Sequence, residues 1–357
     1  METALNVFID KLLTTSAKRQ ASNIHLTVSS YPALRINDEL IELADEEVIT
    51  DSFIRKLADG WLNDEQKKTL EEEREIVLTK EIGKKFRVKI NFFFQKEFLS
   101  ASLRLIPNQA PPLINLGLPK SVYSLTEKTS GLIIIAGPYG SGRTTTMAAM
   151  IEEINKTRKQ SIVTIEKPIE FIFSNKKSLI LQREVGRDTN SFMDALEYAQ
   201  QSDVDVCGIG VTTEAGVLPL VLEFANSGRL AFLNMETTSV IQTIEEILAN
   251  FPADEKERAR LLLSESLVAI IVQRLLPKIG GGMVLASEVL IETPSVKSLI
   301  REGKIKQIAT VLQSSREEGM TSLDQSLSAL VKSGEVLIDQ AIKEADDPDN
   351  FRAMAKS

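Results

Sequence analysis

The chain has 357 residues, which is more than one hydrophobic core usually serves, so we expect two domains. The formal net charge of −8 argues against a dedicated nucleic-acid binder, and the single cysteine, Cys207, excludes an intrachain disulfide or a cysteine-cluster metal site. No apolar run approaches the roughly 18–20 residues of a membrane helix and no signal peptide opens the chain, so we expect a cytoplasmic protein.

The first hundred residues predict a small α+β domain, residues 1–106. Apolar residues recur at helical spacing in two segments, and β-branched and aromatic runs separate them. The lone histidine, His25, alternates with apolar neighbours and has no second histidine to share a metal, so a structural or solvent-facing role is favoured. The expected elements are a helix over residues 3–20, strands at 24–28 and 33–36, a strand from residue 41 after a turn at Asn37-Asp38, helical pattern over 51–73, and strands at 86–94 and 99–106.

Four prolines then crowd into residues 107–119. Proline fixes φ and has no backbone N–H, so this composition argues against a helix or a central strand and predicts a linker. Strands alternate with helices over the next domain, residues 120–290, which predicts a parallel or mixed sheet covered by helices. Residues 291–357 are expected to be mainly helical. The strands expected in the domain of residues 120–290 are 131–136, 161–165, 204–209, 229–233 and 283–290.

A glycine-rich segment at residues 137–144 has the spacing of a phosphate-binding loop, G-x-x-x-x-G-K-[ST], with arginine in place of lysine. An apolar run precedes it, and a helical pattern over 144–155 follows it, which is the order such a loop requires. A tight glycine turn without a ligand is the alternative, and so many matched positions disfavour it. We therefore expect a nucleotide site, with Mg²⁺ on the hydroxyl of Thr144. Its residues are Gly137, Pro138, Gly140, Ser141, Gly142, Arg143, Thr144 and Thr145.

Several ordered segments beyond this loop resemble the PilT/PilU family of type IV pilus motor ATPases within the secretion-ATPase superfamily. The resemblance implies an α/β protein, in which a PAS-like α+β domain precedes a RecA-like P-loop NTPase domain with a helical C-terminal segment. It also implies ATP or ADP with Mg²⁺ as cofactor. The segments that carry it are residues 21–26, 86–91, 103–107, 164–170, 182–189, 264–267 and 293–304.

The partners implied by the resemblance are other copies of this chain in a hexameric ring, or an intact motor ATPase in a mixed ring. The ring would lie on the cytoplasmic face of the inner membrane, against the platform protein of the pilus machine. Cations of the first domain would complete the nucleotide site, and the matching positions are Arg87, Lys89 and Arg104. A solvated strand charge is the alternative reading of each.

The catalytic segments of the family are altered in this chain. Arg143 replaces a compact ammonium by a planar guanidinium, which weakens the fit of the loop around a phosphate. Lys167 stands where the family has an aspartate, beside the retained Glu166, which is left as a candidate catalytic carboxylate. The family's catalytic glutamate falls on Val211, and valine can neither accept a proton nor orient water.

Two histidines of the family are also absent, since Arg229 and Glu236 stand at their positions. The joint changes predict a weak or inactive ATPase that acts as a partner or regulator of an intact pilus motor. One alternative is an active retraction ATPase that uses displaced carboxylates, Glu166, Glu170 or Glu214. Another is an interaction ring in which nucleotide plays no part.

Overall fold

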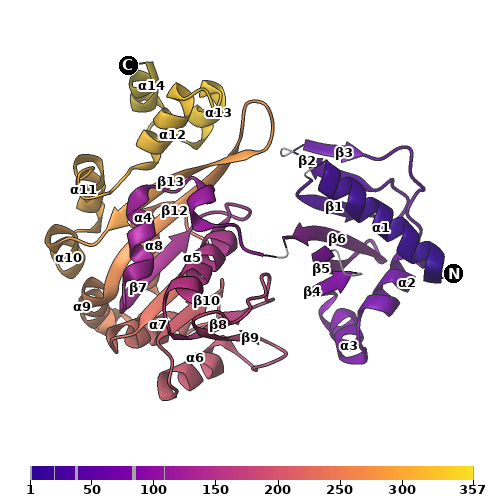
Figure 1. Ribbon diagram of the computed structural model, residues 1–357, viewed down its shortest axis with the longest axis horizontal. Coiled ribbons are helices and arrows are strands. Elements are labelled where there is room, and N and C mark those ends of the chain that lie inside the picture. Colours follow the sequence, from indigo (N-terminus) through magenta and orange to yellow (C-terminus); the bar gives the residue numbers. More distant parts are fainter. Residues whose placement is uncertain (1, 20, 37–38, 83–85, 108, 357) are drawn as a thin grey trace. The chain divides into compact units, whose positions relative to one another are not determined.

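The computed structural model in Figure 1 describes residues 2–19, 21–36, 39–82, 86–107 and 109–356. The turn expected at Asn37-Asp38 lies outside the described residues. The chain divides into two compact units, Met1–Gln109 and Ala110–Ser357, and each has a hydrophobic core of its own. Across the described ranges, no helix is both long enough and apolar enough to span a lipid bilayer.

The first unit is a six-stranded antiparallel sheet with helices packed on it, in the strand order β3-β2-β1-β6-β5-β4. Along β5, Val88, Ile90 and Phe92 are buried and alternate with more exposed residues, which is the pattern of a sheet with one face on a core. Its elements are α1 Glu2–Lys18, β1 Asn23–Leu26, β2 Ala33–Ile36, β3 Glu39–Glu42, α2 Asp51–Trp61, α3 Asp64–Glu73, β4 Glu75–Ile82, β5 Phe86–Gln95 and β6 Phe98–Ile106.

Two features of this unit differ from the expectation. Residues 51–73 form two helices instead of one continuous segment, because Asn63 begins α3 with a capping box in which it exchanges hydrogen bonds with Gln66. Strand β4 was not expected, because it is an edge strand with a mixed, charged composition and only Leu78 is buried. The lone tryptophan, Trp61, belongs to the core and packs edge-on against Phe92.

The second unit is built on a seven-stranded sheet with the order β13-β12-β7-β11-β10-β8-β9. All neighbouring strands are parallel except β12 and β13. Its strands are β7 Gly131–Ala136, β8 Ser161–Glu166, β9 Leu179–Glu184, β10 Val206–Ile209, β11 Leu230–Met235, β12 Leu267–Pro277 and β13 Met283–Ile291. Its helices are η1 Leu113–Leu116, α4 Lys120–Ser124, η2 Leu125–Glu127, α5 Arg143–Thr157, α6 Phe192–Gln201, α7 Val217–Asn226, α8 Val240–Ala249, η3 Ala253–Glu255, α9 Lys256–Ser266, α10 Pro294–Arg301, η4 Ile305–Gln307, α11 Ile308–Ser314, α12 Leu323–Lys332, α13 Ile338–Glu344 and α14 Pro348–Lys356.

Helices cover both faces of this sheet, so β7 is buried at every residue. Leu132 and Ile134 face the layer made by α6 to α11, whereas Ile133 and Ile135 face α5 and the segment 113–125. Cys207 of β10 is fully buried in the first of these layers, as expected for a core strand. A strand covered on both faces reads as a continuous apolar run, which is why β7 was predicted at its observed bounds.

Two parts of this unit differ from the expectation, while the C-terminal segment is helical as expected. Strands β9 and β12 were missing from the expectation: β9 is an edge strand with leucines on its exposed face, and β12 follows α9 without a break. The proline-rich segment contains the short helix η1, and Leu113 and Leu118 are buried beside α5. The C-terminal helices α12 to α14, yellow in Figure 1, pack against the β12–β13 hairpin through a small core of their own.

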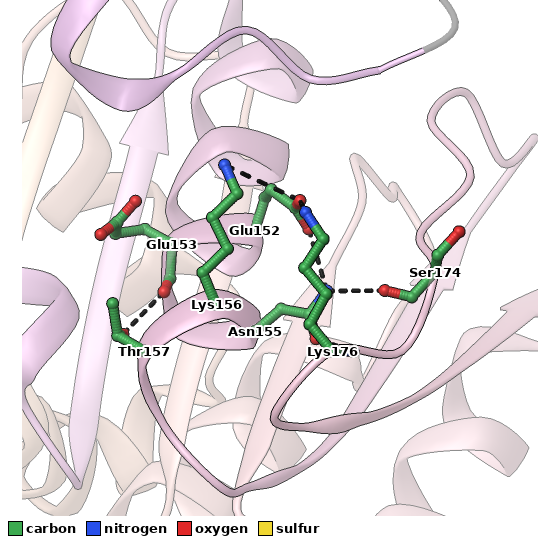
Figure 2. Close-up of polar contacts among 7 residues, drawn as sticks. All are labelled: Glu152, Glu153, Asn155, Lys156, Thr157, Ser174 and Lys176. Carbon is green, nitrogen blue, oxygen red and sulfur yellow. Dashed lines mark hydrogen bonds and ion pairs between the residues drawn. The ribbon is translucent and has the colours of Figure 1, made fainter.

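Figure 2 shows how the end of α5 is tied to a neighbouring loop. The fully buried Asn155 donates through Nδ2 to Glu152 Oε2 and to the backbone oxygen of Ser174, both at 2.9 Å. Its Oδ1 accepts from the backbone N–H of Lys176 at 3.0 Å, and Lys176 also pairs with Glu152. This network fixes the far end of the helix that begins at the glycine-rich loop.

We expect Asn155→Ala to lower the free energy of unfolding by about 2–4 kcal/mol, because it removes three hydrogen bonds of a fully buried side chain, two of them to partly buried backbone groups. Thr157→Val is the control. Its hydroxyl donates to the backbone oxygen of Glu153 at an exposed position, so the loss should stay under about 1 kcal/mol. Urea unfolding followed by far-UV circular dichroism measures both, and equal losses would contradict the anchoring role of Asn155.

Candidate phosphate-binding site

The glycine-rich loop joins the end of β7 to the start of α5 and leaves no room for side chains at its base. A Cβ atom on Gly137 would lie 2.4 Å from Ser141 Oγ and 2.6 Å from the backbone oxygen of Gln273. Gly142, which precedes α5, has φ 92°, a conformation that favours glycine. The loop is therefore a closely wrapped backbone cradle at a helix N-terminus, the arrangement that binds phosphate groups.

Polar atoms around the cradle support this reading. Ser141 Oγ, Asn234 Oδ1 and Gln273 Oε1 are buried, and none has a hydrogen-bond partner within the described part of the chain. Asn234 stands opposite Ile135 in the β11–β7 register, one residue before the end of each strand. Buried polar atoms are nearly always paired in folded proteins, so unpaired ones beside such a loop fit a polar ligand.

Arg143, the first residue of α5, is bound by the strand next to the loop. Its side chain is buried, with the residue 7% exposed. Nη1 donates to the backbone oxygen of Met235 at 2.7 Å, and Nη2 donates to Oε1 of Glu236 at 2.6 Å. Because Met235 pairs with Ala136 in the sheet, Glu236 comes level with Gly137 at the entrance of the loop. The structure thus joins two altered positions that the sequence presented separately.

Val211 follows the end of β10 at the same edge of the sheet, with β11 between it and the loop strand β7. Its side chain is partly exposed and apolar, so it offers no group that can take a proton. Lys167, the other altered position of this edge, is exposed directly after β8. Neither residue brings a carboxylate to the loop.

Glu166 ends β8 and is 5% exposed. Burial raises the pKa of its carboxyl to about 7 and nearby Glu170 adds to the rise, while the hydrogen bond from Thr164 Oγ1, 2.8 Å long, opposes it. Such a group can exchange a proton near neutral pH. It lies three strands from β7, however, which at about 4.8 Å per strand places it about 14 Å from the loop strand, beyond hydrogen-bond reach.

The candidate carboxylate Glu214 and the altered position Arg229 each bind one end of α6. The carboxylate of Glu214 accepts hydrogen bonds from the backbone N–H groups of Phe192 (3.0 Å) and Met193 (3.3 Å), in the first turn of this helix. Arg229 donates to the backbone oxygens of Ala199 and Gln200 in its last turn, at 2.8 and 3.0 Å. Both side chains complement the helix dipole, which explains them structurally and which the sequence pattern did not reveal.

Comparison with known proteins shows which family this chain belongs to. The family described as "Type II/IV secretion system protein" matches residues 2–283. The chain is 37% identical to the type IV pilus retraction ATPase PilT of Pseudomonas aeruginosa, over 96% of this chain and 99% of that protein. The chain belongs to the PilT-like type II/IV secretion ATPase family. The resemblance drawn from the sequence is confirmed.

Two further comparisons agree with this assignment. A twitching motility protein of Neisseria gonorrhoeae is 36% identical, over 95% of this chain and 91% of that protein. The crystal structure of the pilus retraction motor PilT with bound ADP matches with a TM-score of 0.84 at 37% identity, over 96% of this chain and 98% of that one. The expected α/β fold is therefore that of a PilT-like secretion ATPase, while the PAS-like character of the first unit stays a prediction.

In this PilT-like chain, the three cations expected from the first unit lie on one face of its sheet. Lys89 of β5 stands opposite Arg104 of β6, and Arg87 is two residues before Lys89, so all three side chains share a face. Arg87 donates to Thr79 Oγ1 at 3.0 Å and lies 3.9 Å from a carboxylate oxygen of Glu81. Their grouping is a property of this unit alone, and their part in a nucleotide site stays a prediction.

The raised pKa of Glu166 predicts how stability depends on pH. The folded state holds the proton up to about pH 7, whereas the pKa of an unperturbed glutamate is 4.5. Stability is therefore lost as pH rises from about 4.5 to 7. We expect Glu166→Gln to equal the wild type at pH 4, below both pKa values, and to be more stable by about 3 kcal/mol at pH 8.

Urea unfolding at both pH values measures this difference. Glu265→Gln, at an exposed position, controls for the removal of a charge alone. Burial also raises the pKa of Glu288 to about 7, so Glu288 makes the stability of both proteins depend on pH. The wild type and the variant are therefore compared with each other at each pH. A stability difference between them that does not change with pH would contradict the assignment.

Proposed function

We propose that this chain is a subunit of the type IV pilus machinery that binds a nucleotide in its loop and hydrolyses ATP weakly or not at all. In this role it acts in the cytoplasm, at the inner-membrane pilus machine, as partner or regulator of an intact motor. The identity to PilT and to a twitching motility protein supports the pilus context. The ADP bound to the related retraction motor, and the cradle around Gly137, support nucleotide binding, with Thr144 as the Mg²⁺ ligand.

The observation that best supports the loss of hydrolysis is Val211, which lies just after β10. Val211 occupies the edge of the sheet where the resemblance assigns the catalytic glutamate, and the displaced candidates do not replace it. Glu166 is buried three strands from β7, and Glu214 binds the first turn of α6. Loss of a general base typically lowers a rate by about 10²–10⁴.

We also propose that this chain assembles into a ring. The coverage of nearly the whole PilT chain supports a ring of copies of this subunit, or a mixed ring with an intact motor, resting on the platform protein of the pilus machine. The shared face of Arg87, Lys89 and Arg104 supports a contact with phosphate groups from the first unit. In a mixed ring, the chain would supply a nucleotide-binding subunit that does not turn over.

We expect the purified chain to hydrolyse Mg·ATP at least about 100-fold more slowly than PilT of Pseudomonas aeruginosa under the same conditions. It should still gain thermal stability from Mg·ADP, because a ligand that binds only the folded state raises the melting temperature. Gly137→Ala, whose new methyl group collides with the loop, should abolish that gain while far-UV circular dichroism stays unchanged.

Hydrolysis within tenfold of PilT would contradict the proposal, and no stabilisation at millimolar ADP would favour an interaction ring without nucleotide. The pKa of about 7 for Glu166 keeps an active motor as a second candidate. If turnover is found, the variants Glu166→Gln, Glu170→Gln and Glu214→Gln identify its source, because a catalytic carboxylate loses activity when it becomes an amide. Under the proposal, none of the three changes the residual rate.

A further inference from the structure

The contact between Arg143 and Glu236 changes the charge of the phosphate loop. The two atoms are 2.6 Å apart and the residues are 93 positions apart in the chain, brought together by the parallel pairing of β11 with β7. Arg143 is buried, whereas the side chain of Glu236 is 54% exposed. The family pattern has a lysine and a histidine at these positions, so this chain has gained a carboxylate at the entrance of the loop.

The planar guanidinium suits this pairing better than an ammonium. Its two terminal nitrogens engage two acceptors at once, the backbone oxygen of Met235 and the carboxylate of Glu236. Hydrogen bonds between ionised groups are short and strong, and the burial of Arg143 limits screening by solvent. A phosphate that enters the loop must therefore either separate the pair or bind beside a cation that the carboxylate already neutralises.

We propose that Glu236 is an internal counter-ion that competes with nucleotide phosphates for Arg143. The nucleotide affinity of this chain is then set by the stability of the Arg143–Glu236 pair. This inference rests on the proposed function, because it takes the loop to be a nucleotide site. On this inference the two substitutions act together: Arg143 keeps a cation in the loop, and Glu236 pairs with that cation.

A relocated catalytic base is the competing explanation for Glu236. It lies after β11, the strand between the loop strand β7 and strand β10, and Val211 follows the end of β10, so Glu236 approaches the place of the missing glutamate. Its carboxylate, however, accepts a hydrogen bond from Arg143 Nη2, and that contact directs it to the cation of the loop. The contact favours the counter-ion role, and the experiment below separates the two.

The test measures the dissociation constant of Mg·ADP by titration calorimetry for the wild type, Glu236→Gln, Arg143→Ala and the double variant. We expect Glu236→Gln to bind ADP about tenfold more tightly, because a charge-assisted hydrogen bond no longer has to be broken. In the Arg143→Ala background the same change should tighten binding by at most about threefold, since the cation in dispute is gone.

Glu223→Gln is the matched control. It removes a carboxylate from another arginine pair of the same unit, Arg258 Nη2 with Glu223 Oε1 at 3.2 Å, with the glutamate 46% exposed, and it should leave ADP affinity unchanged. Glu236→His supplies a second variant with the residue of the family pattern, and it should shift affinity in the same direction. This guards against a folding defect particular to the glutamine.

The outcomes separate this inference from the proposed function. If the wild type binds ADP and Glu236→Gln binds it equally well, the counter-ion role is overturned while nucleotide binding stands. If no variant binds ADP at millimolar concentration, both are overturned. If the wild type hydrolyses ATP and Glu236→Gln abolishes turnover, Glu236 is a catalytic base and the counter-ion role fails. Tighter binding that depends on Arg143 supports the inference.

Discussion

The close approach of the loop backbone to β12 is the constraint on which the site depends. Gly137 lies against Ser141 Oγ and the backbone oxygen of Gln273, so the loop can turn there only without a side chain. That turn fixes where α5 begins, and the buried Asn155 fixes where it ends. Because β7 is covered on both faces, the cradle sits on a rigid strand. The fold thus preserves the shape of a phosphate site independently of the residues that would perform chemistry in it.

The candidate carboxylate Glu214 and two altered positions, Arg143 and Arg229, have structural partners in this fold. Glu214 and Arg229 each bind one end of α6, and Arg143 is bound by the segment after β11. None of these contacts is a surface ion pair of negligible strength, since each engages backbone groups at a helix or strand end. A substitution that gains a structural partner is harder to reverse, because restoring the family residue would leave that partner unsatisfied. Exchange of a single catalytic residue therefore should not rebuild a motor.

The sequence predicted the parts of this protein whose signals are local. Strand β7 and the loop are encoded in one continuous stretch, an apolar run followed by glycines at fixed spacing, and both lie where expected. Edge strand β9 was missed because its exposed face carries Leu179 and Leu181 and obscures the alternation. The Arg143–Glu236 pair could not be read from the sequence, because it follows from the β11–β7 register. An arginine and a new acidic residue, both at altered positions, were the only signal.

Phosphate binding and ATP hydrolysis need different groups, and the chain retains groups for binding but lacks one for hydrolysis. Phosphate binding needs a backbone cradle and a helix N-terminus, and the loop and α5 retain both. Hydrolysis needs in addition a group that orients water, and the segment that follows β10 offers Val211 instead. A counter-ion such as Glu236 would be a burden in a motor, which must bind and release nucleotide in each cycle. In a subunit that senses or holds a nucleotide, it sets the concentration at which the site fills.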